Sequence, residues 1–471
     1  MDTTAAKLNG LGNILVRILS FAVLVFLARF AYVITTTCST YDSRDAIRTA
    51  GVVRLRDFYS SLFQDLVAEG ILYLDSKILC IGTLTDEVVA TLRDLGVADS
   101  TGIAAKPSVR YGRASRIPFE DESFDFVFSG GMDLERTARP IEIANEISRT
   151  LKPGGFFVVL TSGTDPYSLN SLLALFNSYR VIRTSEIDGI DFPSQTIREV
   201  VLMKDDNPLL PDDDPIKFKR RKSSSKCPVP GFMHELVRNA EPLVQEEPLK
   251  PWIILRRNSR NMTYLPSMAD ISFKNRYIYI DVGSKNYRSS IGSWFKKHYP
   301  KQNKPFQIYA IESDSSFHDE YKSKKGVKLL PYAAWIRNET LFFEITRDPS
   351  RRREEPRGRV QTVQSSLEFL GERDKRIQGF DFAEWLESLG LERTDYVVMK
   401  MDVEGTEFHL IRRMIERGVM CLVDELFLEC HYRRRGRRRR RRTSKYEKSY
   451  DQCLELFSSL RQSGVLVHQW W

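Results

Sequence analysis

The sequence predicts an α/β protein with two doubly wound sheets in tandem behind one N-terminal transmembrane helix. Strand-like and helix-like patterns alternate over residues 43–204, and a second alternation fills residues 251–471. An apolar run near the N-terminus is long enough to cross a bilayer. We therefore expect a short N-terminus with its anchor (1–42), a first α/β domain, a linker (205–250) and a second α/β domain.

The length and charge of the chain bear on the number of domains and on the kinds of partner that can be expected. Its 471 residues, 42% hydrophobic, suffice for two or three cores at roughly 150 residues per domain. The net charge of +9 equals that of one run of nine arginines, Arg433 to Arg442. The rest of the chain is neutral, so the net charge says little about the partner of the folded body.

The transmembrane prediction rests on the run from Ile14 to Ile34. A bilayer-spanning helix needs about 20 apolar residues, and Arg17 and Arg29 lie where long side chains can reach the headgroups. No small-residue cleavage site follows, which favours an uncleaved signal anchor. A buried core helix is the alternative, and basic residues on both sides leave the orientation undecided.

The first alternation begins with a predicted strand at Lys77–Gly82, followed by a helix that ends at Gly96. Phe124–Gly130 predicts another strand, and Ile141–Leu160 a helix, a turn and a strand. From Asp205 to about Lys250 the chain is rich in proline, serine and charge, which predicts a linker.

The second alternation predicts helices at Phe380–Gly390 and Lys445–Gly464. Its predicted strands are Arg276–Gly283, Phe306–Ser313, Val327–Trp335, Tyr396–Asp402, Leu422–His431 and Gly464–Trp471.

The six cysteines are too few and too scattered to predict a disulfide scaffold, and without a CxxC pair we expect no metal site. Cys421 and Cys430 bracket a predicted strand, whose extension excludes a bond between them.

Residues 115–160 resemble the latter half of a type 11 methyltransferase domain, a class that binds S-adenosylmethionine. The "LPFxDxSFDxV" and "RxLKPGG" patterns of that family match Ile117–Val127 and Arg149–Gly155. The resemblance implies a Rossmann-like methyltransferase fold.

The groups that would hold the cofactor in this first domain are missing. Gly82 stands alone where the family places three glycines, and Ala104 and Ala105 stand where an acid should bind the ribose. The adenine position, Gly112 to Ser115, lacks its acid too. We therefore expect a degenerate, non-catalytic scaffold.

The residues from Arg276 onward resemble FkbM-type methyltransferases, which are S-adenosylmethionine-dependent O-methyltransferases. Three segments carry the resemblance: "IDVGSKN", "YAIESD" and the thirty-residue block Phe380–Ile411. It implies that Asp281, Gly283 and Ser284 line the turn beneath the methionine portion and that Glu312 accepts hydrogen bonds from the ribose. Since parallel strands end at one rim, the predicted strand ends converge there.

Asp402, Glu404 and His431 are the candidate catalytic residues, either as the base for an acceptor hydroxyl or to orient a sugar. Asp402 and Glu404 are expected to open a helix at Gly405. The alternatives are helix capping with salt bridges to Lys400 or Arg412 for the two acids, and simple exposure for His431.

The sequence departs from the FkbM pattern after Gly283. That family continues with small residues and a second glycine, whereas here Tyr287 and Arg288 follow. These bulky side chains could crowd the methionine pocket.

The arginine run could bind an acidic polysaccharide, anionic lipid headgroups or, as the least favoured partner, nucleic acid; the alternative is a solvated insertion without a partner. As a whole, the chain resembles a plant family of membrane-anchored methyltransferase-like proteins that ends in "YDQCLELFSSLRQSGVLVHQWW". That resemblance implies a Golgi or other endomembrane location. Two sequons, at Asn261 and Asn338, permit a luminal body.

The sequence thus predicts an S-adenosylmethionine-dependent O-methyltransferase acting on a sugar or polysaccharide. The alternative is a membrane-anchored scaffold or interaction protein without catalysis.

Overall fold

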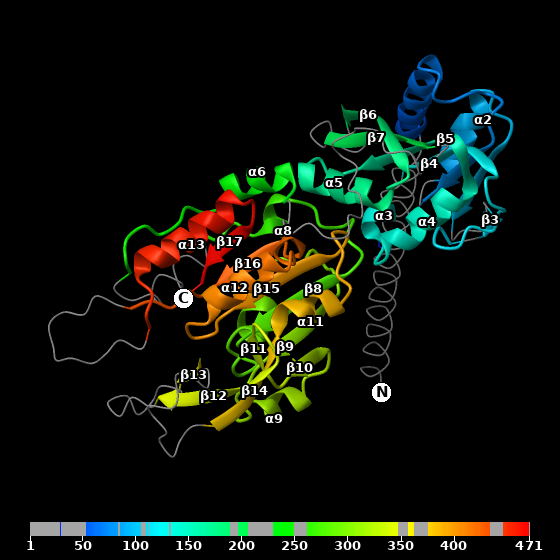
Figure 1. The fold of residues 1–471 in the computed structure, drawn as a ribbon. Helices are drawn as coiled ribbons and strands as arrows, with labels where there is room; N and C mark the ends of the chain where they lie inside the picture. Colours follow the sequence, from blue (N-terminus) through cyan, green and yellow to red (C-terminus); the bar gives the residue numbers. More distant parts are fainter. Residues whose placement is uncertain are drawn as a thin grey trace, which may run out of the picture.

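The computed structural model contains two large α/β sheets with helices packed against them (Figure 1). The predicted α/β class is confirmed; that the two halves fold as independent domains stays a prediction. The structure describes residues 29, 53–82, 85–104, 110–111, 113–130, 133–188, 196–205, 229–248, 261–346, 357–361, 375–433 and 446–470.

Several predicted features lie outside the described residues. These are the span Ile14–Ile34 apart from Arg29, residues 206–228 of the linker, and the arginine run apart from Arg433. Among the helices that the structure describes, none combines the length and the apolar character needed to cross a membrane.

The N-terminal sheet, over the described residues, has seven strands in the order β3-β2-β1-β4-β5-β7-β6. Neighbouring strands are parallel except for β7, which is antiparallel to β5 and β6. The first strand lies inside the sheet and the chain winds outward from it, as in doubly wound folds. The strands are β1 (Ile78–Ile81), β2 (Ser100–Ala104), β3 (Arg110–Tyr111), β4 (Phe124–Ser129), β5 (Leu151–Thr161), β6 (Tyr179–Asp188) and β7 (Thr196–Lys204).

Both faces of this sheet are buried, because alternate side chains of a strand point to opposite faces. Leu79 of β1 belongs to the core that includes α4, whereas Ile78 belongs to the core that includes α2 and the helical residues 53–68. The helices of this half are α2 (Thr85–Asp94), α3 (Asp133–Arg136), α4 (Pro140–Thr150) and α5 (Pro166–Leu175).

The C-terminal sheet has six described strands in the order β10-β9-β8-β15-β16-β17, all parallel. The first strand of this half, β8, lies between the second and the fourth, so the strand order reverses beside it. Ligands of open α/β sheets bind at this switch point, outside the carboxyl ends of the strands. The strands are β8 (Tyr277–Val282), β9 (Phe306–Ile311), β10 (Val327–Leu330), β15 (Tyr396–Met401), β16 (Glu425–Leu428) and β17 (Leu466–Gln469).

Helices also bury both faces of the C-terminal sheet. Ile280 packs in the core with α11, α12 and α13, whereas Tyr279 packs in the core with α6 and the π-helix η1. The elements are η1 (Ile291–Phe295), α8 (Leu265–Met268), α9 (His318–Lys322), α11 (Phe382–Ser388), α12 (Glu407–Glu416), the 3-10 turn η2 (Met420–Leu422) and α13 (Tyr450–Gln462).

A third, four-stranded sheet was not predicted. The single strand expected at Val327–Trp335 is two strands, because Pro331 separates β10 from β11 (Ala333–Trp335) and lacks the N–H that a continuous ladder needs. β11 joins β12 (Glu339–Thr346), β13 (Arg357–Gln361) and β14 (Lys375–Asp381) in the order β11-β14-β12-β13.

The prediction that residues 205–250 form a linker is wrong for residues 231–239, which form a helix. Helix α6 (Gly231–Asn239) contacts α13 and β17, and its side chains Met233, Leu236 and Val237 are buried. Their spacing of three and four residues is that of a core-facing helix, a pattern that the surrounding prolines and charges concealed.

No disulfide scaffold was predicted, but the structure has individual disulfides. Cys430 and Cys453 form a disulfide with a Cα–Cα distance of 5.9 Å, which ties the residues after β16 to α13. Cys421 is in a disulfide as well, and Cys80 is free and buried. The prediction that Cys421 and Cys430 do not pair with each other is confirmed.

The two large sheets touch through α5. The Tyr167 hydroxyl donates to Asp424 Oδ1 at 2.8 Å, and Lys274 Nζ lies 4.9 Å from the centre of the Tyr167 ring. The Asp165 carboxylate accepts from the Asp270 backbone at 3.0 Å.

A buried ion network lies where β16 meets β17. His468 is fully buried, with Nδ1 at 2.7 Å from Glu241 Oε1 and Nε2 at 2.9 Å from Glu425 Oε1. Burial lowers the pKa of His468, but its bonds to the two glutamates outweigh this effect and raise the pKa to about 9. Glu425, also fully buried, further accepts from the Leu265 backbone at 2.9 Å and from the Tyr299 hydroxyl.

Candidate functional site

A pocket opens at the switch point of the C-terminal sheet. Its lining includes Gly283 after β8, Glu312 after β9, and Asp402 and Glu404 after β15. Tyr332, which precedes β11, adds a wall from the four-stranded sheet. The structure therefore brings four of the predicted site residues to one rim.

Gly283 fixes the turn after β8. Its φ of +76° is in the left-handed region, and a Cβ there would lie 1.9 Å from the Asp402 carbonyl oxygen. The backbone N–H groups of Gly283 and Ser284 both donate to Ile311 O, at 3.0 and 3.1 Å. Only glycine lets the chain pass this close to the neighbouring strand.

Glu312 lies at the carboxyl end of the second strand, as expected for a ribose-binding acid. Its Oε2 accepts from Lys285 N and its Oε1 from Asp314 N, both at 2.7 Å. Burial raises the pKa of Glu312 to about 6. Because each carboxylate oxygen can accept a second hydrogen bond, this side chain can still take two bonds from a ligand in the pocket.

Asp281 and Ser284 lie beneath the turn and not in the pocket lining; both are fully buried. The Asp281 carboxylate accepts from Tyr279 Oη at 3.2 Å and from Ser290 Oγ, and Ser284 Oγ accepts from Tyr321 Oη at 3.0 Å. Neither side chain therefore lines the pocket. Both were predicted to bind the cofactor, and both instead stabilise the turn after β8.

Tyr287 does not crowd the pocket. Its ring packs edge-on against Tyr321, at 6.4 Å between centroids, with Lys324 Nζ 4.8 Å from its centre. Arg288 is exposed, and neither residue is part of the pocket lining.

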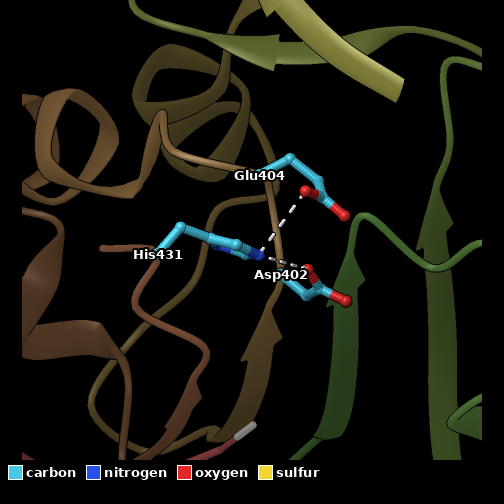
Figure 2. Close-up of side chains that lie close together, drawn as sticks. All are labelled: Asp402, Glu404 and His431. Atoms are coloured by element: carbon cyan, nitrogen blue, oxygen red, sulfur yellow. Dashed lines mark ion pairs between the residues drawn. The ribbon is translucent and has the colours of Figure 1, made fainter. Parts of the chain in front are cut away.

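Asp402, Glu404 and His431 form a compact group beside the pocket (Figure 2). His431 Nε2 lies 3.7 Å from Asp402 Oδ1 and 3.7 Å from Glu404 Oε2. All three side chains are at least nine-tenths buried. The alternative that His431 is simply exposed is therefore wrong.

For the two acids, helix capping is wrong, but the salt bridge to Lys400 in the same alternative is confirmed for Asp402. Helix α12 begins at Glu407 with Thr406 as its N-cap, so Asp402 and Glu404 lie in the turn before it, where Glu404 has a φ of 52°. Arg412 pairs with Glu416 at 2.9 Å instead, while Lys400 Nζ does approach Asp402 Oδ2, at 3.9 Å.

Glu407, which sequence reasoning missed, holds His431 in place. Its Oε1 accepts from the His431 backbone at 2.6 Å and lies 3.3 Å from Nδ1, while its Oε2 accepts from Gly405 N at 2.9 Å. Glu407 is fully buried at the first residue of α12. The "DVEGTE" spacing was the available signal, because the turn brings both ends of this motif to one place.

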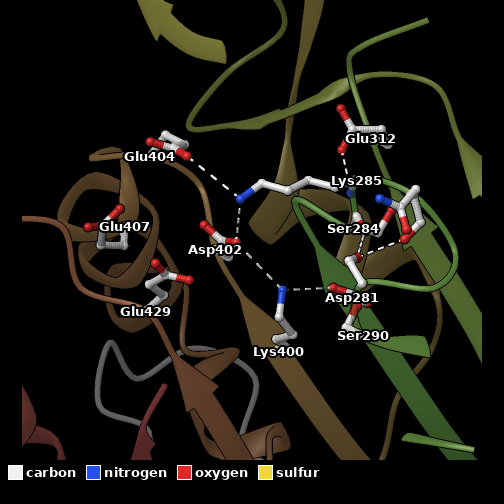
Figure 3. A network of polar contacts seen from close by, with 12 residues as sticks. Asp281, Ser284, Lys285, Ser290, Glu312, Lys400, Asp402, Glu404, Glu407 and Glu429 are labelled. Atoms are coloured by element: carbon white, nitrogen blue, oxygen red, sulfur yellow. Dashed lines mark hydrogen bonds and ion pairs between the residues drawn. The ribbon is translucent and has the colours of Figure 1, made fainter. Parts of the chain in front are cut away.

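Two lysines, Lys285 and Lys400, lie among the carboxylates around Asp402 (Figure 3). Lys285 Nζ lies 2.9 Å from Asp402 Oδ2 and 3.6 Å from Glu404 Oε1, and Lys400 Nζ lies 3.4 Å from Asp281 Oδ1. Burial lowers the pKa of Lys285, but the neighbouring carboxylates, Asp402 first, outweigh it and hold the pKa above its ordinary value. Lys285, which was assigned no role from the sequence, is thus part of the site.

The charges decide which proton-transfer roles are available. Burial lowers the pKa of His431, but Glu407, Glu429 and Asp402 outweigh it and raise the pKa to about 10. Burial opposes ionisation of Asp402, yet Lys285, Lys400 and His431 hold its pKa well below the usual range. At neutral pH, with only these groups present, His431 is a hydrogen-bond donor and Asp402 a very weak base, which argues against either as the base.

A methyltransferase domain model matches residues 79–159, from β1 to β5. The N-terminal sheet thus has a Rossmann-like methyltransferase fold, and the predicted type 11 resemblance is confirmed. The biotin biosynthesis bifunctional protein BioHC of Teredinibacter turnerae is 31% identical over 84 residues, which cover 18% of this chain and 14% of that protein.

A second family model matches residues 237–341 and 349–471, a little under half of the chain, and its description is "Domain of unknown function (DUF7870)". The match covers the six-stranded sheet and the candidate site, including α13. It names no activity.

Solved structures with some similarity include a SAM-dependent methyltransferase from Aquifex aeolicus, 15% identical, covering 30% of this chain and 88% of its own with a TM-score of 0.24. The YcgJ protein from Bacillus subtilis is 13% identical, covering 32% of this chain and all of its own with a TM-score of 0.26. Scores this low carry no argument about either sheet.

Proposed function

We propose that the chain is an S-adenosylmethionine-dependent O-methyltransferase whose C-terminal sheet binds the cofactor and transfers its methyl group to a sugar or polysaccharide. The observation that carries the proposal is the pocket at the switch point, where Gly283, Glu312, Asp402 and Glu404 line one cavity. The methyltransferase fold of the N-terminal half and the FkbM-like segments around the pocket support the same reaction class.

The C-terminal pocket is the better cofactor site of the two. It has a carboxylate at the end of its second strand, Glu312, whereas in the N-terminal sheet β2 ends at Ala104, with Ala105 next in sequence. A ribose needs an acceptor at this position. We therefore assign the N-terminal sheet a structural role, consistent with its contact through Tyr167 to Asp424.

The chemistry divides the pocket into two sides. Glu312 accepts from the ribose hydroxyls, and Asp402, Glu404 and His431 face the acceptor. A lone pair of the acceptor oxygen forms a bond to the methyl carbon, the carbon–sulfur bond breaks, and its electrons stay on sulfur to leave S-adenosylhomocysteine. The hydroxyl proton passes to a carboxylate of the pocket lining, and Glu404 is the candidate because Lys285, Lys400 and His431 hold the pKa of Asp402 well below its usual range.

An acidic polysaccharide is the acceptor class that we favour. The arginine run begins two residues after His431, so nine positive charges follow the proposed acceptor side directly in sequence. An anionic lipid surface is the other partner with matching charge.

Replacing Glu312 by alanine is expected to weaken S-adenosylmethionine binding at least about tenfold, because a ribose hydrogen bond to a charged group contributes roughly 1.5–3 kcal/mol. Isothermal titration calorimetry of the purified full chain measures this. The matched control is Asp319→Ala, a carboxylate on the adjacent helix α9 that is 85% exposed and paired only with Lys322 among the contacts described.

Two results would contradict the proposal in different ways. If Glu312→Ala binds as the wild type does, the cofactor site lies elsewhere, and ultraviolet cross-linking of labelled cofactor followed by peptide mapping would place it, for example in residues 79–159. If the wild type fails to bind at millimolar cofactor, the chain is the non-catalytic scaffold of our alternative hypothesis. Transfer of labelled methyl to polygalacturonate, compared with a neutral glucan, tests the acceptor class.

We further propose that the folded body lies in the lumen of the Golgi or another endomembrane compartment, anchored by the helix predicted at Ile14–Ile34. The disulfide Cys430–Cys453 and the disulfide of Cys421 support an oxidising compartment. Asn261 and Asn338, the two sequon residues, are both exposed.

A luminal body is expected to carry N-linked glycans. Treatment of the chain from a eukaryotic membrane fraction with peptide-N-glycosidase F should increase its gel mobility, and an Asn261→Gln/Asn338→Gln double variant should migrate like the deglycosylated form. A chain with unmodified sequons and reduced cysteines in intact membranes would place the body on the cytosolic side.

A further inference from the structure

The group formed by Asp402, Glu404 and His431 has a feature that ion pairing alone does not explain. Asp402 is 6% exposed, yet its Oδ1 accepts no hydrogen bond within the part of the chain that the structure describes. This oxygen faces His431 Nε2 across 3.7 Å, too far for a hydrogen bond. A buried carboxylate oxygen without a hydrogen bond is costly, so the site calls for a group between these atoms.

His431 is oriented as a metal ligand is. Glu407 binds the Nδ1 side of the ring, at 3.3 Å, so Nε2 is the nitrogen directed at Asp402 and Glu404. A carboxylate that fixes the far nitrogen of a ligating histidine is the usual outer partner in protein metal sites. Tyr446 Oη similarly donates to Glu404, and its ring centroid lies 5.0 Å from that of His431.

The distances fit a shared ion better than a hydrogen-bonded cluster. One atom from each of the three residues lies within 4.8 Å of the other two, and both measured nitrogen–oxygen distances are 3.7 Å. Two ligands bound at about 2.1 Å in tetrahedral geometry are about 3.4 Å apart. Contraction of the group from these separations gives three ligands at bonding distance.

The local charge also favours a cation. Five carboxylates, Asp281, Asp402, Glu404, Glu407 and Glu429, meet in this network and outnumber its three basic groups, Lys285, Lys400 and His431. Both lysines contact Asp402 through its Oδ2 atom. The Oδ1 atom, which faces His431, therefore stays available to a cation.

We propose that Asp402, Glu404 and His431 bind one divalent transition-metal ion, such as Mn²⁺ or Zn²⁺. One imidazole nitrogen and two carboxylate oxygens suit such ions, whereas Ca²⁺ and Mg²⁺ prefer oxygen alone. Three protein ligands leave coordination positions for water or substrate. Because Asp402 and Glu404 line the pocket, the ion is placed to bind an acceptor oxygen and lower its pKa; this role, unlike the binding itself, rests on the proposed function.

Metal binding is tested without cofactor, on the full chain stripped with EDTA. Titration with Mn²⁺, followed by electron paramagnetic resonance, is expected to show one bound ion per chain. His431→Ala and Asp402→Asn should each weaken binding at least about tenfold, and Glu407→Gln by about 10–100-fold. His409→Ala, which removes an exposed histidine of α12, is the matched control and should bind as the wild type does.

Spin-echo spectra of the Mn²⁺-loaded wild type provide a readout that does not depend on folded variants, since a coordinated imidazole gives nitrogen modulation. Folded wild type that binds no stoichiometric ion, or that binds one without this modulation, overturns the proposal and leaves protonated His431 as the balancing charge. Undiminished binding in both His431→Ala and Asp402→Asn overturns it too. A chain that binds Mn²⁺ but no S-adenosylmethionine keeps this site and loses the proposed function.

Discussion

Gly283→Ala is expected to destabilise the C-terminal half by more than about 3 kcal/mol and to abolish binding in the pocket, because a new Cβ has no space. It would lie 1.9 Å from the Asp402 carbonyl oxygen and 2.9 Å from the Asp402 carbonyl carbon, both backbone atoms that side-chain rotation cannot move. The turn after β8 and the turn after β15 would have to separate. Urea unfolding followed by tryptophan fluorescence measures the loss.

The matched control is Gly326→Ala. Gly326 has nearly the same backbone conformation, φ +79°, but no atom lies within 4 Å of the position of its Cβ. Only the left-handed strain of about 1–2 kcal/mol should remain there. Equal losses in the two variants would mean that backbone conformation, and not the close approach of the two turns, requires glycine at position 283.

Glu425→Ala is expected to lower the free energy of unfolding by about 3–5 kcal/mol, the usual effect of breaking a buried ion pair from one side. The substitution leaves His468, which is fully buried, with one carboxylate, and it removes the acceptor of the Leu265 N–H. Denaturant unfolding at pH 7 measures the change. The double variant with His468→Ala should lose less than the sum of the two single losses, because the two residues stabilise each other.

The pH dependence identifies the ion pair as the cause. The folded-state pKa of His468 is raised to about 9, above its unfolded value of about 6.5, so its contribution is complete below about pH 6.5 and disappears as the pH rises through about 9. Wild-type stability should therefore fall between these values, and the fall should shrink in Glu425→Ala. An unchanged alkaline profile would show that Glu425 acts through its hydrogen bonds to Leu265 and Tyr299 and not through His468.

The positions of the strands were largely predictable because buried parallel strands are short, continuous apolar runs. β8, β9 and β15 each fall inside a predicted range, and the acids that follow them meet at one rim as expected. The prediction failed where a local signal was weak: Pro331 divides a single apolar run between two sheets. Helix α6 was missed because its apolar residues lie in a charged, proline-rich segment.

The candidate site was predictable in its residue types but not in its roles. Asp402, Glu404 and His431 come together, yet the partner that orients His431 is Glu407, whose place depends on α12 beginning after the turn. Lys285 was assigned no role from the sequence, yet it bridges two carboxylates, Asp402 and Glu404. The disulfide at Cys430 could not be inferred because 23 residues of sequence separate its partners, and only the packing of α13 brings them together.

The division of the chain at Pro331 has a consequence for how this fold can diversify. The floor of the pocket belongs to the six-stranded sheet, but Tyr332, Ala333 and Ala334 on its wall belong to β11 and the residue before it. Substitutions or length changes in this accessory layer would reshape the cavity while the strands that carry Gly283 and Asp402 keep their register. The segment around β11 can therefore change which ligand the pocket accepts, while the six-stranded sheet maintains the stability of the fold.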